Sequence, residues 1–298
     1  MPDLTALLSA KEPIEFYFSA DTQRLYSQKE LASVLSANRQ AWHLPTAVKL
    51  PTFLLFLKKH SRLQLCKLKA EAPYPRQITR YSWGPASTLE LAHSLHRRGY
   101  FSHGTALALH KVGGAKPRTF YLNVEQSAKE PPSALLTQEA LDRVFTGKQR
   151  LSKLVYKHGK NSVIKLAGKN TGRSNIIDAK AADGAIVPVT TLERTLIDIV
   201  VRPAYAGGPA AVLSAYRNSI GRVSATKILR ILDAFDYVYP YHQSIGFLME
   251  AAGYPPEAFE LFYEDDLRFD FYLDYGMAQP RYSKKWRLHY PASLRLRA

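Results

Sequence analysis

The densest group of side chains able to ligate a metal ion or move a proton is formed by His93, His96, His103 and His110. On a helix, His93 and His96 lie on one face because residues three apart are neighbours there. No His-Glu-x-x-His or comparable signature contains them, and the single cysteine, Cys66, excludes a four-cysteine zinc site. We therefore interpret these histidines as surface or packing residues.

Acidic side chains supply the other candidates for metal or proton chemistry. Asp178-x-Lys180 at a strand end resembles the metal-dependent nucleases, but those need further acids before it, and none stands in a suitable position. Asp270 and Asp274 share a strand face and, with the acidic pair at 265–266, could bind a cation. A solvated strand face is the simpler interpretation of these acids.

Signatures of nucleophilic catalysis and of phosphate-binding loops are missing. The chain contains neither Gly-x-Ser-x-Gly nor Gly-x-x-x-x-Gly-Lys-Ser/Thr. Gly113–Gly114 and Gly207–Gly208 are typical of turns, and Arg194 with Asp198, four residues on, predicts a structural ion pair on a helix. The sequence thus predicts a protein that is not an enzyme and that uses no metal or cofactor.

Basic residues are concentrated enough to indicate an anionic partner. The chain carries 41 Lys and Arg against 25 Asp and Glu, a net charge of +16 with a pI near 9.8, and such a surplus favours polyphosphates. From Arg39 to Arg80, nine basic residues stand against one acid, Glu71. The candidate DNA-binding residues here are Arg39, Gln40, Lys49, Thr52, Lys58, Lys59, Arg62, Lys67, Arg76 and Arg80.

The first four of these candidates surround a turn between two helices. Arg39 and Gln40 fall in the turn itself, where bidentate groups can meet a base edge or a phosphate. Lys49 and Thr52 flank the start of the second helix, where backbone amides and hydroxyls commonly bind a phosphate.

The basic residues that follow leave two interpretations open. Lys58, Lys59 and Arg62 either contact DNA or satisfy the helix C-terminus, whose dipole favours cations. Lys67 and Lys69 point outward only if their strand packs through its other face.

Helix signals define the element that would carry this turn. Ser27 is an N-cap for a helix over 28–37, and residues 38–50, with Pro45, predict a turn with a short helical piece. Pro51 suits the first turn of a second helix over 51–59.

Two strands follow these helices. Residues 63–69 and 77–83 alternate apolar and polar side chains, the period of half-buried strands. The prolines at 73 and 75 bar regular pairing, so residues 70–76 predict a protruding loop. Two helices followed by a two-stranded ribbon predict a winged helix-turn-helix, in which one helix enters the major groove.

The chain after Gly84 has a mixed pattern. Helices are predicted at 88–97, 102–110, 133–147, 208–219, 224–236 and 241–252, and strands at 118–124, 162–166, 176–180, 185–189, 267–273 and 285–289. Thr190 to Glu193 reads as a Thr-x-x-Glu capping box that opens a helix ending at Val201. Because no regular βαβ rhythm appears, we predict an α+β fold: a winged helix-turn-helix domain over 1–90 and a larger α+β domain over 91–298.

Length and composition are those of a globular chain of about two domains. It has 298 residues, 46% of them hydrophobic and 22% charged, and its longest apolar run, 53–57, is far shorter than a bilayer span. The segment Met1–Ser9 lacks the cationic start of a secretory signal. We expect a soluble cytoplasmic protein without membrane association.

Longer motifs resemble a known family. They are Tyr-Phe-Ser-His-Gly-Thr-Ala-Leu-Ala-Leu-His at 100–110, Phe-Tyr-Leu-Asn at 120–123, Val-Thr-Thr-Leu-Glu-Arg-Thr-Leu-Ile-Asp at 189–198, Arg-Pro-x-Tyr-x-Gly-Gly at 202–208 and Trp-Arg-Leu-His-Tyr-Pro at 286–291. In combination they resemble the AbiEi family, antitoxins of bacterial type IV toxin–antitoxin and abortive-infection (phage defence) systems. The likeness spans nearly the whole chain.

This resemblance implies a two-part bacterial protein. Its N-terminal winged domain would bind inverted repeats in its own promoter and repress the operon. Its C-terminal part would neutralise a cognate toxin with a nucleotidyltransferase fold, without requiring a stable complex. The alternatives are a metal-dependent nuclease or other nucleic-acid-processing enzyme, and a pure interaction protein that binds only the toxin.

A second basic stretch, 148–173, holds eight cations and no acid. We expect it either to continue the DNA-facing surface or to meet RNA or an acidic toxin surface. Its members are Lys148, Arg150, Lys153, Lys157, Lys160, Lys165, Lys169 and Arg173.

Overall fold

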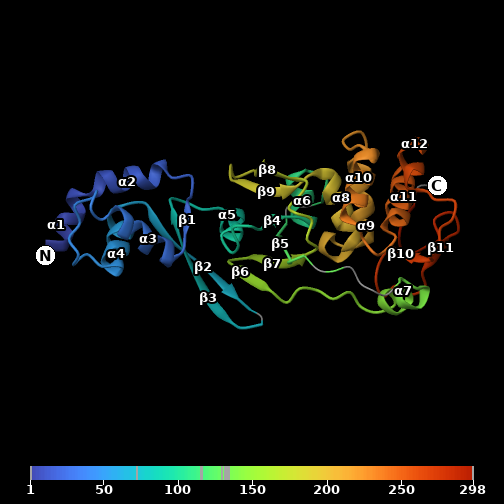
Figure 1. Ribbon diagram of the computed structural model, residues 1–298, viewed down its shortest axis with the longest axis horizontal. Helices are drawn as coiled ribbons and strands as arrows, with labels where there is room; N and C mark the ends of the chain where they lie inside the picture. Colours follow the sequence, from blue (N-terminus) through green and yellow to red (C-terminus); the bar gives the residue numbers. More distant parts are fainter. Residues whose placement is uncertain (1, 72, 115–116, 129, 131–134, 297–298) are drawn as a thin grey trace. The chain divides into compact units, whose positions relative to one another are not determined.

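The computed structural model describes the chain except residues 1, 72, 115–116, 129, 131–134 and 297–298. It has a mixed α+β fold, as predicted, and its contacts divide the chain into two compact units (Figure 1). The first unit comprises 1–97 together with 154–163 and 182–185, and the second comprises 98–153, 164–181 and 186–298.

The first unit combines helices with an antiparallel sheet. Its helices are α1 (Pro2–Ser9), α2 (Lys11–Ala20), α3 (Gln28–Asn38), α4 (Leu50–His60) and α5 (Thr88–His93), and its strands are β1 (Leu25–Tyr26), β2 (Leu63–Ala70), β3 (Arg76–Trp83) and β6 (Val155–His158). The strand order is β1-β3-β2-β6. The sequence did not predict α1, α2, β1 or β6.

Local signals account for the two central helices of this unit. Ser27 accepts the amide of Glu30, whose carboxylate accepts the amide of Ser27, so α3 begins with a complete capping box. Pro51 lies in the first turn of α4, as predicted. The apolar face of α4, Phe53 included, packs into a core with Trp42, which stacks on the Phe53 ring at 5.9 Å.

Strands β2 and β3 form a half-buried hairpin, but burial alternates only in the second half of β2, because Leu65 is exposed. Leu68 and Ala70 are buried, whereas Lys67 and Lys69 alternate with them and are exposed. The open question about these lysines is thereby resolved, because the strand packs through its Leu68 face. The described residues between the strands, 71 and 73–75, are exposed and irregular.

The second unit is built around a sheet of order β7-β5-β4-β9-β8. These strands are β4 (Tyr100–Phe101), β5 (Thr119–Glu125), β7 (Asn161–Gly168, which begins in the first unit), β8 (Ile176–Lys180) and β9 (Ile186–Thr190). The helices are α6 (His103–Leu109), α7 (Gln138–Phe145), α8 (Leu192–Val201), η1 (Pro203–Ala206), α9 (Pro209–Asn218), α10 (Ala225–Phe235), α11 (Tyr241–Ala252), α12 (Pro256–Phe259) and η2 (Glu260–Phe262). A small sheet, β10-β12-β11, comprises Phe271–Tyr272, Leu288–Tyr290 and Arg281–Ser283.

Helix α8 lies at the centre of this unit, and its predicted cap was wrong by one residue. Thr190 pairs with Ile176 as the last residue of β9, so it is not free to cap the helix. Thr191 is the N-cap and accepts the amide of Arg194 at 3.4 Å. Glu193 is therefore not at the capping-box position, and its carboxylate instead lies 3.1 Å from the Lys227 ammonium.

Several other predicted elements are shorter than expected. The helix predicted over 88–97 ends at His93, because the amides of Leu95 and His96 bond three residues back and tighten the chain into turns. The helix predicted from 133 begins at Gln138, after its Thr137 N-cap; residues 133–134 lie outside the described part. The strand predicted over 267–273 is reduced to 271–272.

None of the helices in the described part of the chain combines the length and apolar character that crossing a bilayer requires.

Candidate functional site

Helix α4 presents a polar and basic outer face. Its Phe53, Leu54, Phe56 and Leu57 are buried, so the helical period leaves Thr52, Leu55, Lys58 and Lys59 exposed. Leu55 is 63% exposed, a large apolar side chain flanked by cations. Both predicted lysines of this helix are therefore accessible to an anionic partner.

The turn before α4 holds its arginine in place. The Arg39 guanidinium donates to the carbonyl oxygens of Pro45 and of Val48, the latter at 2.8 Å. Gln40 and Lys49 are exposed. Arg39 thus closes the turn, and part of its hydrogen-bonding capacity is already used.

The ribbon carries a row of lysines on one face. Lys67 and Lys69 lie on the exposed face of β2, and Lys157 of β6 stands directly opposite Lys69. Like charges in opposite positions of an antiparallel pair repel each other. An anion lying across the two strands would relieve this repulsion.

Two arginines of the ribbon have different surroundings. Arg76 is exposed at the start of β3, as is Arg62 before β2. Arg80 instead donates from Nε and Nη2 to the Ser94 carbonyl, at 3.3 and 3.1 Å. Partial burial lowers the pKa of the Arg80 guanidinium.

The second basic stretch is divided between the two units. Lys157 and Lys160 belong to the first, and Lys157 Nζ donates to Ser162 Oγ at 2.7 Å. The other six belong to the second. They are exposed Lys148, Arg150, Lys153 and Lys169 and half-buried Lys165 and Arg173.

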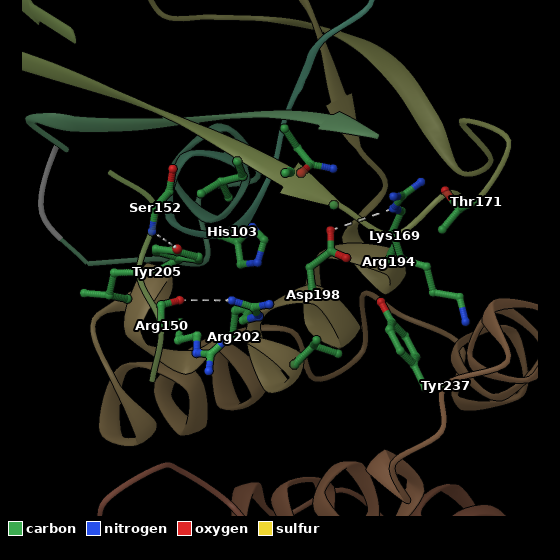
Figure 2. Close-up of a pocket in the computed structure, with 16 residues that line it drawn as sticks. His103, Arg150, Ser152, Lys169, Thr171, Arg194, Asp198, Arg202, Tyr205 and Tyr237 are labelled. Atoms are coloured by element: carbon green, nitrogen blue, oxygen red, sulfur yellow. Dashed lines mark hydrogen bonds and ion pairs between the residues drawn. The ribbon is translucent and has the colours of Figure 1, made fainter. Parts of the chain in front are cut away.

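A cavity of about 370 Å³ lies within the second unit. It is lined by α8 and η1, by the end of β7 and by residues 150–152. Figure 2 shows Arg150 and Arg202 on one side of it, Lys169 and Tyr237 on the other, and His103 and Asp198 between them. Arg150 and Lys169, two cations of the second basic stretch, thus line the same cavity as two other arginines. These are Arg194 of α8 and Arg202, the C-cap of that helix.

A buried network fixes Arg194 in the cavity wall. Arg194 is 2% exposed, and its Nη2 donates to the Tyr100 hydroxyl at 2.5 Å. That hydroxyl donates to Glu125 at 2.9 Å, which lies 3.6 Å from the Arg194 Nη2. The guanidinium also lies over the Tyr100 and Phe235 rings. Arg194 is therefore a positioning residue.

Asp198 is the acid of the cavity. Its Oδ2 lies 3.8 Å from Arg194 Nε, which confirms the predicted ion pair but is too long for a hydrogen bond. Nε itself has no hydrogen-bond partner among the described residues. Burial raises the pKa of Asp198 to about 6, against the opposing effect of Arg194.

His103 contributes a neutral ring. Its Nδ1 lies 2.8 Å from Ser102 Oγ, and the ring meets Tyr205 edge-on at 5.5 Å. Burial, together with the charges of Arg202 and Arg194, lowers the pKa of His103 to about 3. The lining of the cavity therefore combines four cations with an acid and an uncharged imidazole.

This cavity was missed by the sequence analysis, which interpreted its histidine and ion pair as structural. Its residues come from segments around 103, 123, 150, 168, 198 and 237. Arg150 and Lys169 were singled out by charge, but no local pattern indicates that they meet α8.

Comparison with known proteins finds a similar fold but no matching family. No family model matches the chain, and no curated protein matches it. Among solved structures, the chain is similar to the crystal structure of the RV2827C protein from Mycobacterium tuberculosis, with a TM-score of 0.54 and 12% identity over 96% of this chain and 91% of that chain. At this identity the likeness concerns the fold alone.

The acids considered for metal chemistry are dispersed. Asp178 and Lys180 are exposed on β8. Asp270 accepts from Arg287 Nε at 2.9 Å and from the Tyr282 hydroxyl at 2.5 Å. In the part of the chain that the structure describes, no group of three or more His, Cys, Asp or Glu side chains is placed to hold a metal ion.

Proposed function

We propose that this protein is a DNA-binding transcriptional autorepressor and an antitoxin of the type IV toxin–antitoxin class. One observation carries the DNA-binding half: Lys58 and Lys59 on α4 and Lys67 and Lys69 on β2 are all exposed, in a segment, 31–70, that contains no acid. Such a surface attracts phosphates and repels few of them.

The order of elements supports a winged helix-turn-helix for this unit. Helix α3, the turn closed by Arg39, helix α4 and the β2–β3 ribbon follow one another as in that motif. Helix α4 would enter the major groove, where Thr52 and Leu55 face base edges. The lysines of α4 and of the ribbon would bind the flanking phosphates, which supply affinity and orientation.

The antitoxin half rests on the motifs at 100–110, 189–198 and 202–208 that resemble the AbiEi family. These segments form α6, α8 and η1 of the second unit. This unit would oppose a nucleotidyltransferase-like toxin, and the cytoplasm of a bacterium is where both activities would be exercised.

The test is binding of the full-length protein to the DNA upstream of its own gene, compared with a scrambled duplex, across salt concentrations. We expect preference for the upstream DNA, and a negative slope of log affinity against log salt whose magnitude falls by about 0.9 for each phosphate contact removed. Lys58→Ala with Lys59→Ala removes two candidate contacts.

The matched control is Lys11→Ala with Lys29→Ala, on α2 and α3, which removes the same charge from the same unit. Equal, weak binding of both duplexes would refute autorepression. An equal loss in the control would refute the assignment to α4. For the antitoxin half, failure to restore growth on co-expression with the neighbouring toxin gene would be decisive.

A further inference from the structure

The cavity of the second unit has features that repression does not use. Arg150 is exposed, and Arg202 Nη1 donates to the Arg150 carbonyl at 3.3 Å, which keeps the two residues adjacent. Neither guanidinium is paired with an acid within ion-pair distance among the described residues. Both residues line the cavity, and guanidinium groups without a paired acid favour a phosphate, whose geometry matches their forked donors.

Asp198 adds a negative charge to the lining of the cavity. The Asp198 carboxylate faces the cavity (Figure 2), and no donor of the described residues forms a hydrogen bond with it. Buried carboxylates normally accept hydrogen bonds, so this one lacks donors. A simple anion would be repelled by Asp198, whereas hydroxyl or amino groups would satisfy it.

The dimensions restrict the ligand further. A volume of about 370 Å³ is at the lower end of the range, about 300–1,000 Å³, that small-molecule sites occupy. The Tyr237 ring lines the side opposite Arg150 and Arg202 (Figure 2), with Lys169 Nζ 5.3 Å from its centroid. The cavity is thus sized for one small ligand with an anionic end and a donor-bearing body.

We propose that this cavity binds a small phosphate ester that carries hydroxyl or amino donors, of the nucleotide or sugar-phosphate class. Arg150 and Arg202 hold the phosphate, and Asp198 accepts hydrogen bonds from the donors. Arg194 contacts no ligand atom and instead orients Asp198, because its other nitrogens are already bonded to Tyr100 and the Ser174 carbonyl.

The same chemistry can come from a free nucleotide or from the 5′-phosphate of a nucleic acid end. Isothermal titration of the full-length protein at low ionic strength separates these sources, using AMP, ribose 5-phosphate, a 5′-phosphorylated oligonucleotide, adenosine and inorganic phosphate as probes. We expect AMP or ribose 5-phosphate to bind at least tenfold more tightly than adenosine and inorganic phosphate.

Tighter binding of the oligonucleotide with its 5′-phosphate than without it, lost in Arg150→Glu, would also support the proposal and assign the ligand to a nucleic acid end. The proposal would be overturned if none of the phosphorylated probes bound saturably. Equal affinity for AMP and inorganic phosphate would also overturn it, because Asp198 would then contribute nothing.

Two variants locate the site. Arg150→Glu should weaken the binding of AMP or ribose 5-phosphate at least tenfold. Lys148→Glu makes the same charge change two residues away and outside the cavity, and it should leave the affinity within twofold of wild type. Equal weakening in both would reduce the effect to overall charge and refute the cavity. Operator binding, measured in parallel, tests the proposed function separately, since the cavity does not depend on it.

Discussion

Basic residues that look alike in the sequence have different surroundings in the first unit. Arg80 donates to the carbonyls of Ser94 and Thr79, whereas Arg76, four residues earlier, is exposed. We predict that Arg80→Ala lowers the free energy of unfolding by about 1–3 kcal/mol, because buried acceptors lose a charged donor. Arg76→Ala should stay within about 0.5 kcal/mol. Urea unfolding followed by circular dichroism measures both, and equal effects would contradict the distinction.

The pH dependence of stability reports on Asp198. Burial raises its pKa from 3.8 to about 6, so the folded state binds this proton more tightly than the unfolded state. Between pH 4 and 6 its contribution therefore destabilises the fold as pH rises, by an amount on the order of 2–3 kcal/mol. His103, with a lowered pKa, acts with the opposite sign, since stability falls as its unfolded form takes up a proton below pH 6.5.

The two contributions are separated by difference. The free energy of unfolding of wild type minus that of Asp198→Asn should decrease from pH 4 to pH 6. If this difference in the free energy of unfolding did not change with pH, the Asp198 carboxyl group would not be held in a desolvated site.

Helix α11 needs a glycine at position 246, where it packs against Trp286. A Cβ at Gly246 would lie 2.2 Å from two ring carbons of Trp286, which is fully buried and donates from Nε1 to Glu250 at 2.5 Å. Alanine gains about 1 kcal/mol of helix propensity over glycine, but overpacking costs about 1–3 kcal/mol or more. We predict that Gly246→Ala lowers the melting temperature, whereas Gly114→Ala, with open space around it, does not. A neutral Gly246→Ala would contradict the packing.

The lysine row across β2 and β6 links stability to binding. Replacing Lys157 by glutamate turns its repulsion with Lys69 into attraction, worth about 0.2–1 kcal/mol. We therefore predict that Lys157→Glu keeps or raises the melting temperature and weakens binding to duplex DNA. Lys160→Glu, in the adjoining turn, should leave the melting temperature unchanged. A loss of stability in Lys157→Glu would show that the row is not under charge repulsion.

At the scale of the whole molecule, the first unit is not one continuous segment. Strand β6 belongs to it and extends the sheet beyond β2, with His158 Nδ1 2.9 Å from the Lys67 carbonyl and the Glu71 amide donating to Val155. A fragment of residues 1–97 removes the partners of the Lys67 carbonyl and of the Glu71 amide. We predict that this fragment unfolds at lower urea than 1–97 joined by a flexible linker to 154–163; equal midpoints would contradict the role of β6.

Much of the local structure could be predicted from the sequence. The Ser27 cap, Pro51 and the position of strand β2 depend on neighbours a few residues away, although the alternation predicted over 63–69 fails at the exposed Leu65. The two N-terminal helices were missed because their apolar residues find partners only in the core that α4 completes. The cap of α8 was misplaced by one residue because the pairing of Thr190 in β9 competes with it.

The sequence by itself determined the α+β class, the positions of the longer central elements and the two basic stretches, since propensity and charge are properties of the chain. Only the tertiary structure decided which cations act together. It placed Lys157 opposite Lys69 and Arg202 against the Arg150 carbonyl. It also buried Arg80 partially while leaving Arg76 exposed. Such choices follow from strand pairing and desolvation between segments far apart in the chain, which no local pattern encodes.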